Sequence, residues 1–125
     1  MSVYIVVHNT KYDEIKETSK YLYETLNKLY PDIPRSYHDG SFIVIGGDIQ
    51  IDLRWGIEPD KLAGIRPNYY YTDSDGYMAD MLAQSAYKVN GKRLKNMEQL
   101  IQIINFYMSM YTVINQWLET QNKED

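Results

Sequence analysis

Apolar and polar residues follow two rhythms in the first part of this chain, and each rhythm predicts a different element. Residues 3–7 form a run of β-branched and aromatic side chains, which is typical of a buried strand. From residue 13 to residue 29 the apolar positions recur at steps of three and four, as on one face of a helix. Asn9-Thr10 is the predicted cap of this helix. The predicted buried face carries Ile15, Ser19, Leu22, Leu26 and Leu29.

The middle of the chain changes to a period of two, which predicts a β-hairpin. Two arms, Phe42–Ile45 and Asp48–Trp55, flank Gly46-Gly47, and glycine adopts the positive φ of a tight hairpin turn without strain. Tyr37–Gly40 reads as a turn before the hairpin, and residues 56–67 as a loop after it. In the second arm, Ile49, Ile51, Leu53 and Trp55 point to one face, and Gln50, Asp52 and Arg54 to the other.

The last third of the chain predicts a strand, a helix, a turn and a long helix. Tyr69–Thr72 reads as the strand, and a helix then runs to about Tyr87. Asn90-Gly91 is the turn. The long helix covers Asn96–Thr120, and Gln99 completes a capping box at its start.

This long helix has no charged residue between Glu98 and Glu119, so a membrane span has to be weighed. One polar stripe argues against a span, because its members recur at steps of three and four: Gln102, Asn105, Ser109, Thr112 and Gln116. The remaining apolar face is too wide for one small sheet to cover. We therefore expect a homo-oligomer, built on a dimer through Asn96–Thr120, and no membrane contact.

Length and composition favour a single α/β domain over residues 1–125. Its expected architecture is a small mixed sheet with a β-hairpin, packed by an N-terminal helix and a long C-terminal helix. The chain has no cysteine, which excludes disulfides and thiol nucleophiles. Its 13 basic and 17 acidic residues give no global attraction to nucleic acid. Because the first residues lack the pattern of a signal peptide, we expect a cytoplasmic protein.

One segment supports a resemblance to a known family. Residues 48–75 read DIQIDLRW, then PDKLAGIRPN, then YYYTDSD. This order resembles the ATPase domain of phage large terminases and related helicase-like motors. In that family a hairpin leads to a Leu-x-Gly-x-Arg-Pro-Asp-like turn, and a strand then ends in the acidic pair that holds magnesium. The likeness covers about residues 3–85, with its distinctive part at Lys61–Asp73. It implies a related sheet topology and a viral or mobile-element origin.

The segment departs from that family in the residues that would perform catalysis. The chain has no Gly-x-x-x-x-Gly-Lys-Ser/Thr loop, so the cradle for a triphosphate is missing. Asp73 matches the first acid of the pair, but Ser74 replaces the glutamate that would position the attacking water. The resemblance therefore argues against ATP hydrolysis.

Asp73 and Asp75 form the most suggestive pair of carboxylates. They directly follow a hydrophobic strand, where two carboxylates can bind Mg²⁺ through oxygen ligands. The alternative is that one of them caps the following helix. His8 and His38, the only histidines, show no catalytic or metal-binding spacing, and ordinary packing is favoured for both.

Three cations and a run of tyrosines predict a phosphate site. Arg54, Lys61 and Arg66 lie close together in the sequence and could hold phosphate oxygens. Tyr69 and Tyr71 could stack on a base beside them. The alternative is that the cations form salt bridges with the acids of the same stretch, which are Asp48, Asp52, Glu58 and Asp60. The basic cluster between Lys88 and Lys95 reads as a solvated turn.

These observations favour a non-catalytic, stoichiometric binding protein. We expect a viral or mobile-element accessory or inhibitor that sequesters a nucleotide-like phosphate ligand. No cofactor is expected, and the alternative is a magnesium ion at Asp73 and Asp75. One alternative is an inhibitor that binds a host protein without a small ligand. Another is a small metal-dependent phosphoesterase or nuclease that uses Asp73 and Asp75. A third is a purely structural subunit of an oligomer.

Overall fold

The computed structural model describes residues 2–32, 35–38, 42–45, 48–58, 62 and 64–123. Contacts within the chain gather into two compact units, Met1–Leu94 and Lys95–Asp125. The first unit contains a sheet and two helices, and the second is one long helix.

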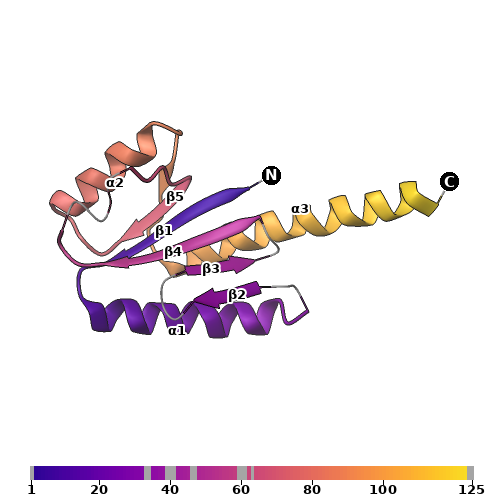
Figure 1. Ribbon diagram of the computed structural model, residues 1–125, viewed down its shortest axis with the longest axis horizontal. Coiled ribbons are helices and arrows are strands. Elements are labelled where there is room, and N and C mark those ends of the chain that lie inside the picture. The colour runs from indigo at the N-terminus through magenta and orange to yellow at the C-terminus, as the bar shows by residue number, and fades with distance from the viewer. Residues whose placement is uncertain are drawn as a thin grey trace. The chain divides into compact units, whose positions relative to one another are not determined.

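A six-stranded mixed sheet forms the body of the first unit (Figure 1). Its strand order is β2-β3-β4-β1-β5-β6. The strands β4, β1, β5 and β6 are parallel, whereas β2 pairs antiparallel with β3, and β3 with β4. The bounds are Val3–Asn9 for β1, Arg35–His38 for β2, Phe42–Ile45 for β3, Ile49–Trp55 for β4, Tyr69–Thr72 for β5 and Lys92–Arg93 for β6.

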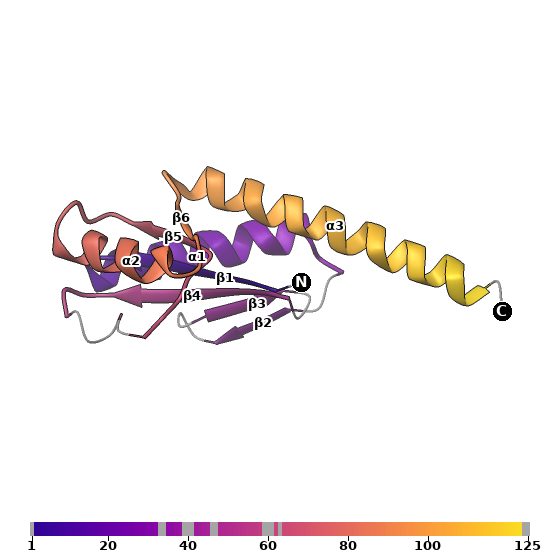
Figure 2. The same cartoon turned by 90° about the horizontal axis from the view of Figure 1, so that it is seen from above.

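Helices α1 (Tyr12–Leu29) and α2 (Tyr77–Tyr87) lie on opposite faces of this sheet, as Figures 1 and 2 show together. α1 contacts β1 and β4 and buries one stripe of side chains: Ile15, Ser19, Leu22 and Leu26. α2 packs Met78, Leu82 and Ala86 into a cluster with side chains from two neighbouring strands, Val6 and Tyr70. Both faces of the central strand β1 are therefore covered, which explains its run of apolar residues.

The α/β class, the mixed sheet and the antiparallel pairing of β3 with β4 confirm the sequence analysis. The turn Gly46-Gly47 lies outside the described residues. Two predicted core positions are wrong: Leu29 is 45 % exposed and Trp55 is 43 % exposed. Leu29 is the last residue of α1, and Trp55 is the last residue of β4. Each therefore lies at the end of its element, where fewer neighbours cover a side chain.

Two strands were not predicted. β2 covers Arg35–His38, where the sequence suggested a turn from Tyr37, and its partner is the neighbouring arm of the hairpin. β6 has only two residues and pairs with β5. A glycine fixes this pairing: a Cβ on Gly91 would lie 2.2 Å from the Pro67 carbonyl oxygen, so only glycine fits between the Asn90 turn and β6.

The second unit is α3, Met97–Lys123. Its start confirms one half of the predicted capping box, because the Gln99 backbone N–H donates to Asn96 Oδ1 (2.9 Å). The return bond differs from the prediction: Gln99 Oε1 accepts from the backbone N–H of Lys95 (2.7 Å), one residue before Asn96. Its buried residues are Leu100, Ile104 and Met108. Among the described residues, no helix is long and apolar enough to cross a bilayer.

Candidate functional site

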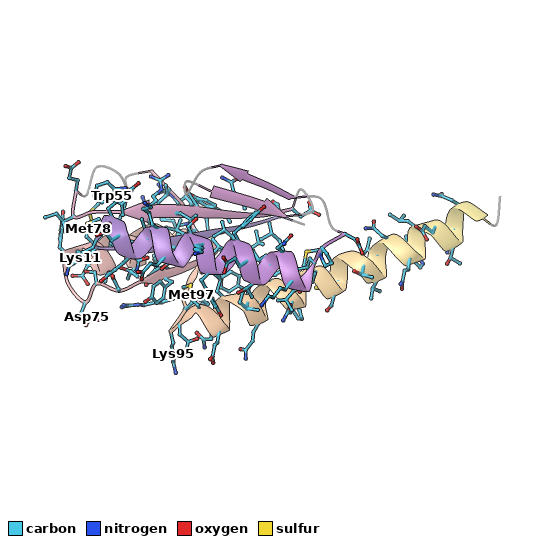
Figure 3. All side chains as sticks on the ribbon, turned by 90° about the horizontal axis from the view of Figure 1, so that it is seen from below. Lys11, Trp55, Asp75, Met78, Lys95 and Met97 are labelled. Carbon is cyan, nitrogen blue, oxygen red and sulfur yellow. The ribbon has the colours of Figure 1, made fainter. Side chains whose placement is uncertain are left out.

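The parallel strands end together at one edge of the sheet, and the chain leaves two neighbours there in opposite directions. After β1 it enters α1 on one face, and after β5 it leads to α2 on the other face (Figures 1 and 2). In open α/β sheets the crevice at such a switch point is the usual place for a ligand. Figure 3 shows Lys11, Trp55 and Asp75 at this end of the sheet.

Asp73 joins the ends of β5 and β1. One carboxylate oxygen accepts hydrogen bonds from the Thr10 backbone N–H (2.9 Å) and the Thr10 hydroxyl (2.8 Å). The other accepts from the Asn9 side-chain amide (3.2 Å), whose own oxygen accepts from the Thr18 hydroxyl (3.0 Å). The sequence predicted that Asn9-Thr10 caps α1, but Thr10 bonds to Asp73 instead. The N-cap residue is Lys11, which makes no capping bond through its side chain.

Glu14, one turn into α1, shares a hydrogen bond with Asp73. This bond is the main cause that raises the pKa of the exposed Glu14 carboxyl, with smaller contributions from desolvation and from the Asp73 charge. Burial works to raise the pKa of Asp73, but hydrogen bonds from Glu14, Thr10 and Asn9 outweigh it and lower that pKa. The two pKa shifts have opposite directions, so Glu14 is the carboxyl of the pair that holds a proton more readily.

Tyr71 and Arg93 border the carboxyl pair. Burial is the main cause that raises the pKa of the Tyr71 phenol, and the charges of Asp73 and Glu14 add to it, which places the phenol close to the pair. The Arg93 guanidinium, from β6, donates to the carbonyl oxygens of Ser74 (3.1 Å) and Thr72 (3.4 Å). We call Asn9, Thr10, Glu14, Tyr71, Asp73 and Arg93 the carboxyl-edge site.

His8 lies beneath this site and is fully buried. Its Nε2 lies 2.8 Å from the Gly56 carbonyl oxygen, which can only accept, so Nε2 carries a proton. In the neutral ring, Nδ1 then accepts from the Thr72 hydroxyl (2.8 Å), which itself accepts from the Ser74 backbone N–H. His8 thus ties the ends of three parallel strands together, in agreement with the packing role expected from the sequence. The side chain of His38 lies outside the described residues.

An aromatic group stands next to the carboxyl-edge site. The rings of Tyr12 and Trp55 meet edge to face with centroids 5.1 Å apart, and Lys16 Nζ lies 5.6 Å from the Tyr12 centroid. Tyr12 is 50 % exposed, and Ile57 further along the chain is 72 % exposed. Exposed rings at the edge of a polar site can stack on a planar ligand.

The structure separates the residues of the predicted phosphate site. Arg54 pairs across the sheet with His8, as Thr72 does, so its side chain is on their face, whereas Tyr69 and Tyr71 alternate to the opposite face. Arg54 also donates two hydrogen bonds to Asp52 Oδ2 (2.8 and 3.0 Å). That oxygen accepts from the Tyr4 hydroxyl as well (2.6 Å). For Arg54 the structure therefore favours the alternative of an internal salt bridge.

The exposed Arg66 donates to the backbone oxygen of its neighbour Ile65, and Lys61 lies outside the described residues. Neither Asp73 nor Asp75 caps α2, because the N-cap is Gly76 and no side chain bonds there. The Asp75 side chain is fully exposed, and its carboxylate lies 3.8 Å from the Arg93 guanidinium. Of the predicted residues that the structure describes, Tyr71 and Asp73 belong to the carboxyl-edge site.

Within the described ranges, no group of three or more His, Asp or Glu side chains converges to hold a metal ion. Magnesium at Asp73 would therefore need its remaining ligands from water or from a bound phosphate. No protein family, curated protein or solved structure matches this chain.

Proposed function

We propose that this protein is a non-catalytic binding protein that holds a nucleotide-like, phosphate-bearing ligand at the carboxyl-edge site. The observation that carries the proposal is the switch point between β1 and β5, where α1 and α2 depart to opposite faces. The polar side chains that gather there come from three parallel strands and from the first turn of α1. This arrangement matches the position at which open α/β sheets bind nucleotides.

The chemistry of the site suits a ligand that arrives with a divalent cation. Mg²⁺ is commonly held by one or two carboxylates, and the phosphate oxygens of the ligand complete its shell. A cation between Glu14 and Asp73 would favour the ionised form of both carboxyls. Arg93 lies beside them with a cationic group for a further phosphate oxygen, and the Tyr12–Trp55 pair offers rings for a base.

The same geometry supports binding more than turnover. Both carboxylate oxygens of Asp73 already accept hydrogen bonds from Thr10 and Asn9. The side chain of Asp75, the other acid of the nuclease alternative, is fully exposed. A hydrolytic site would need a freely placed base or a second metal ligand at the position of the attacking water.

Isothermal titration calorimetry with nucleoside di- and triphosphates, with and without Mg²⁺, tests the proposal. We expect heat of binding with Mg²⁺. In Glu14→Gln a neutral amide replaces the exposed carboxylate that would bind the cation, so binding should be at least tenfold weaker. Glu24→Gln, on the same helix and also exposed, is the matched control and should bind as the wild type does. Equal nucleotide affinity in both variants would mean that the Glu14–Asp73 pair does not bind the ligand or its cation.

A pair of arginine variants separates the carboxyl-edge site from the site that the sequence suggested. Arg93→Ala should lose about 1.5–3 kcal/mol of binding free energy, the range for hydrogen bonds to charged groups. Arg66→Ala should bind as the wild type does, because Arg66 does not belong to the carboxyl-edge site and its guanidinium donates to the carbonyl oxygen of its neighbour Ile65. The reverse result would favour the Arg66 loop. If no nucleotide binds with either metal condition, an inhibitor that binds a protein partner becomes the better reading.

A further inference from the structure

The C-terminal part of α3 exposes large apolar side chains that the carboxyl-edge site does not use. Phe106 is 62 % exposed, Val113 63 % and Trp117 59 %. The sequence between Glu98 and Glu119 contains no charged side chain, so no charge lowers the cost of exposing this apolar surface to water. Monomeric proteins seldom carry a contiguous apolar surface of this kind without a partner.

The exposed residues follow the spacing of a coiled-coil seam. Phe106, Val113 and Trp117 are exposed, and the half-buried Ile103 and Met110 lie in the same row. These five residues are separated by alternating steps of three and four, which is the a/d pattern of a heptad repeat. The buried stripe of the same helix has another spacing, with steps of four from Leu100 to Ile104 to Met108. The helix therefore carries two distinct apolar stripes, and the a/d seam is the exposed one.

The middle of this seam has the shape that a coiled-coil partner needs. A shallow apolar hollow of about 260 Å³ lies on α3 and is lined by Phe106, Ser109, Met110, Val113 and Ile114. Four of these residues stand at positions i, i+3, i+4 and i+7, which is the diamond of side chains that receives one knob from a facing helix.

We propose that two copies of this chain pair through their α3 helices in an antiparallel coiled coil. In an antiparallel pair each a position faces a d position. The seam satisfies this rule in one register: Phe106 faces the partner's Trp117, and Met110 faces the partner's Val113. In that register the Val113 side chain of each copy enters the hollow of the other. The seam is thus complementary to itself, as a two-fold interface requires.

Charge and size also favour a second copy over another protein. The positions that flank the seam on one side are the uncharged Gln102, Ser109 and Gln116, so no charge pattern selects a different partner. Antiparallel helices also place opposite ends of their dipoles together. With aromatic side chains burying about 150–250 Å² each, the exposed seam supplies roughly 400 Å² per copy. The pair then approaches the roughly 1,000 Å² of a specific interface once its flanking residues are included.

Light scattering coupled to size-exclusion chromatography at micromolar concentration tests the pairing with two neighbouring substitutions. The wild type should have twice the chain mass of 14.8 kDa. Val113→Glu should raise the dissociation constant at least about a hundredfold, because each copy brings an unpaired charge into the seam. Thr112→Glu adds the same charge one residue away, on the polar stripe, and should remain a dimer. Because Val113 is exposed within one chain, its variant should keep the helical circular dichroism of the wild type.

Disulfide trapping tests the direction and register, since the natural chain has no cysteine. The antiparallel register brings Ser109 of one copy near the partner's Gln116. A mixture of Ser109→Cys and Gln116→Cys chains should therefore form mixed disulfides faster than either variant alone. A monomeric wild type at micromolar concentration, a dimeric Val113→Glu variant, or faster trapping of each variant with itself would each overturn the proposal.

Discussion

The sheet unit and α3 use similar apolar side chains in opposite ways. In β1, five consecutive residues from Ile5 to Asn9 are buried. Strands β4 and β5 pair with its two edges, and helices of the same chain cover the two faces of the sheet. In the second half of α3, Val113, Ile114, Trp117 and Leu118 are each at least 45 % exposed. Apolar composition alone therefore does not determine burial. What differs is whether the covering surface comes from the same chain or, as we propose for α3, from a second copy.

The two regions also treat their polar groups differently. At the carboxyl-edge site Asp73 binds the loop that starts α1, and no buried side-chain polar atom of the described residues lacks a hydrogen bond. In α3 the hydroxyls of Ser109, Thr112 and Thr120 bond only back to carbonyl oxygens of their own helix. The sheet unit uses polar bonds to connect distant segments, whereas these three hydroxyls of α3 bond within their own helix.

The largest expected effect compares one core residue with one seam residue. Ile51→Ala removes a fully buried side chain from β4 and should lower the free energy of unfolding by about 2–5 kcal/mol. Val113→Ala should change it by less than about 0.5 kcal/mol in dilute solution, where the chain is monomeric. Urea unfolding over a range of protein concentrations measures both effects. A large loss from Val113→Ala in dilute solution would mean that the seam is already covered within one chain.

A smaller effect is expected at the carboxyl-edge site. Asp73→Ala leaves the Thr10 and Asn9 donors without their acceptor and should cost about 1 kcal/mol of unfolding free energy, because water reaches this site. Asp75→Ala, two residues away with a fully exposed side chain, should leave stability unchanged. Chemical denaturation of both variants provides the comparison. Equal losses would mean that Asp73 does not hold the loop.

The smallest effect concerns the dependence of stability on pH. The pKa of Glu14 is raised above its unfolded value of 4.5, so its contribution to stability is present in acid and is lost as the pH rises through the folded pKa. The pKa of Asp73 is lowered, so its contribution has the opposite sign and is lost as the pH falls through its folded pKa. Glu14→Gln should therefore melt slightly higher than the wild type at neutral pH.

Thermal melts across acidic and neutral pH measure this difference between Glu14→Gln and the wild type. The difference should close in acid, once the wild-type Glu14 is protonated and resembles the amide. Glu24→Gln should show no such closing gap. A constant offset at every pH would mean that Glu14 and Asp73 do not share a proton.

Periodicity predicted most of the fold because the core faces are regular. The stripe from Ile15 to Leu26 on α1 and the alternation of Ile49, Ile51 and Leu53 on β4 are confirmed. The short strands β2 and β6 were missed, because four residues and two residues are too few to show a period. Their pairing depends on neighbours that are distant in the sequence, such as Tyr70 for Arg93.

The candidate site was only partly predictable for the same reason. Asp73 and Tyr71 were identified because they lie on or directly after an apolar strand. Glu14 read as an ordinary acid in the first turn of a helix, and Arg93 as part of a solvated basic turn. Glu14 meets Asp73 because β1 and β5 are neighbours, and Arg93 reaches the Ser74 carbonyl oxygen because β6 pairs with β5. The available signal was the order of elements along the sequence, in which one predicted helix follows β1 and another follows β5.

The central position of β1 has a consequence for how the chain is made. The N-terminal strand pairs with β4 through Val3 and Ile49, and with β5 through His8 and Thr72. A ribosome must therefore release the chain as far as Trp55 before β1 can pair with β4, and as far as Thr72 before it can pair with β5. Pairings this distant in sequence form slowly, and until then the apolar run of β1 is open to contacts with other molecules. During that interval α1, which directly follows β1 in the chain, can already form beside it.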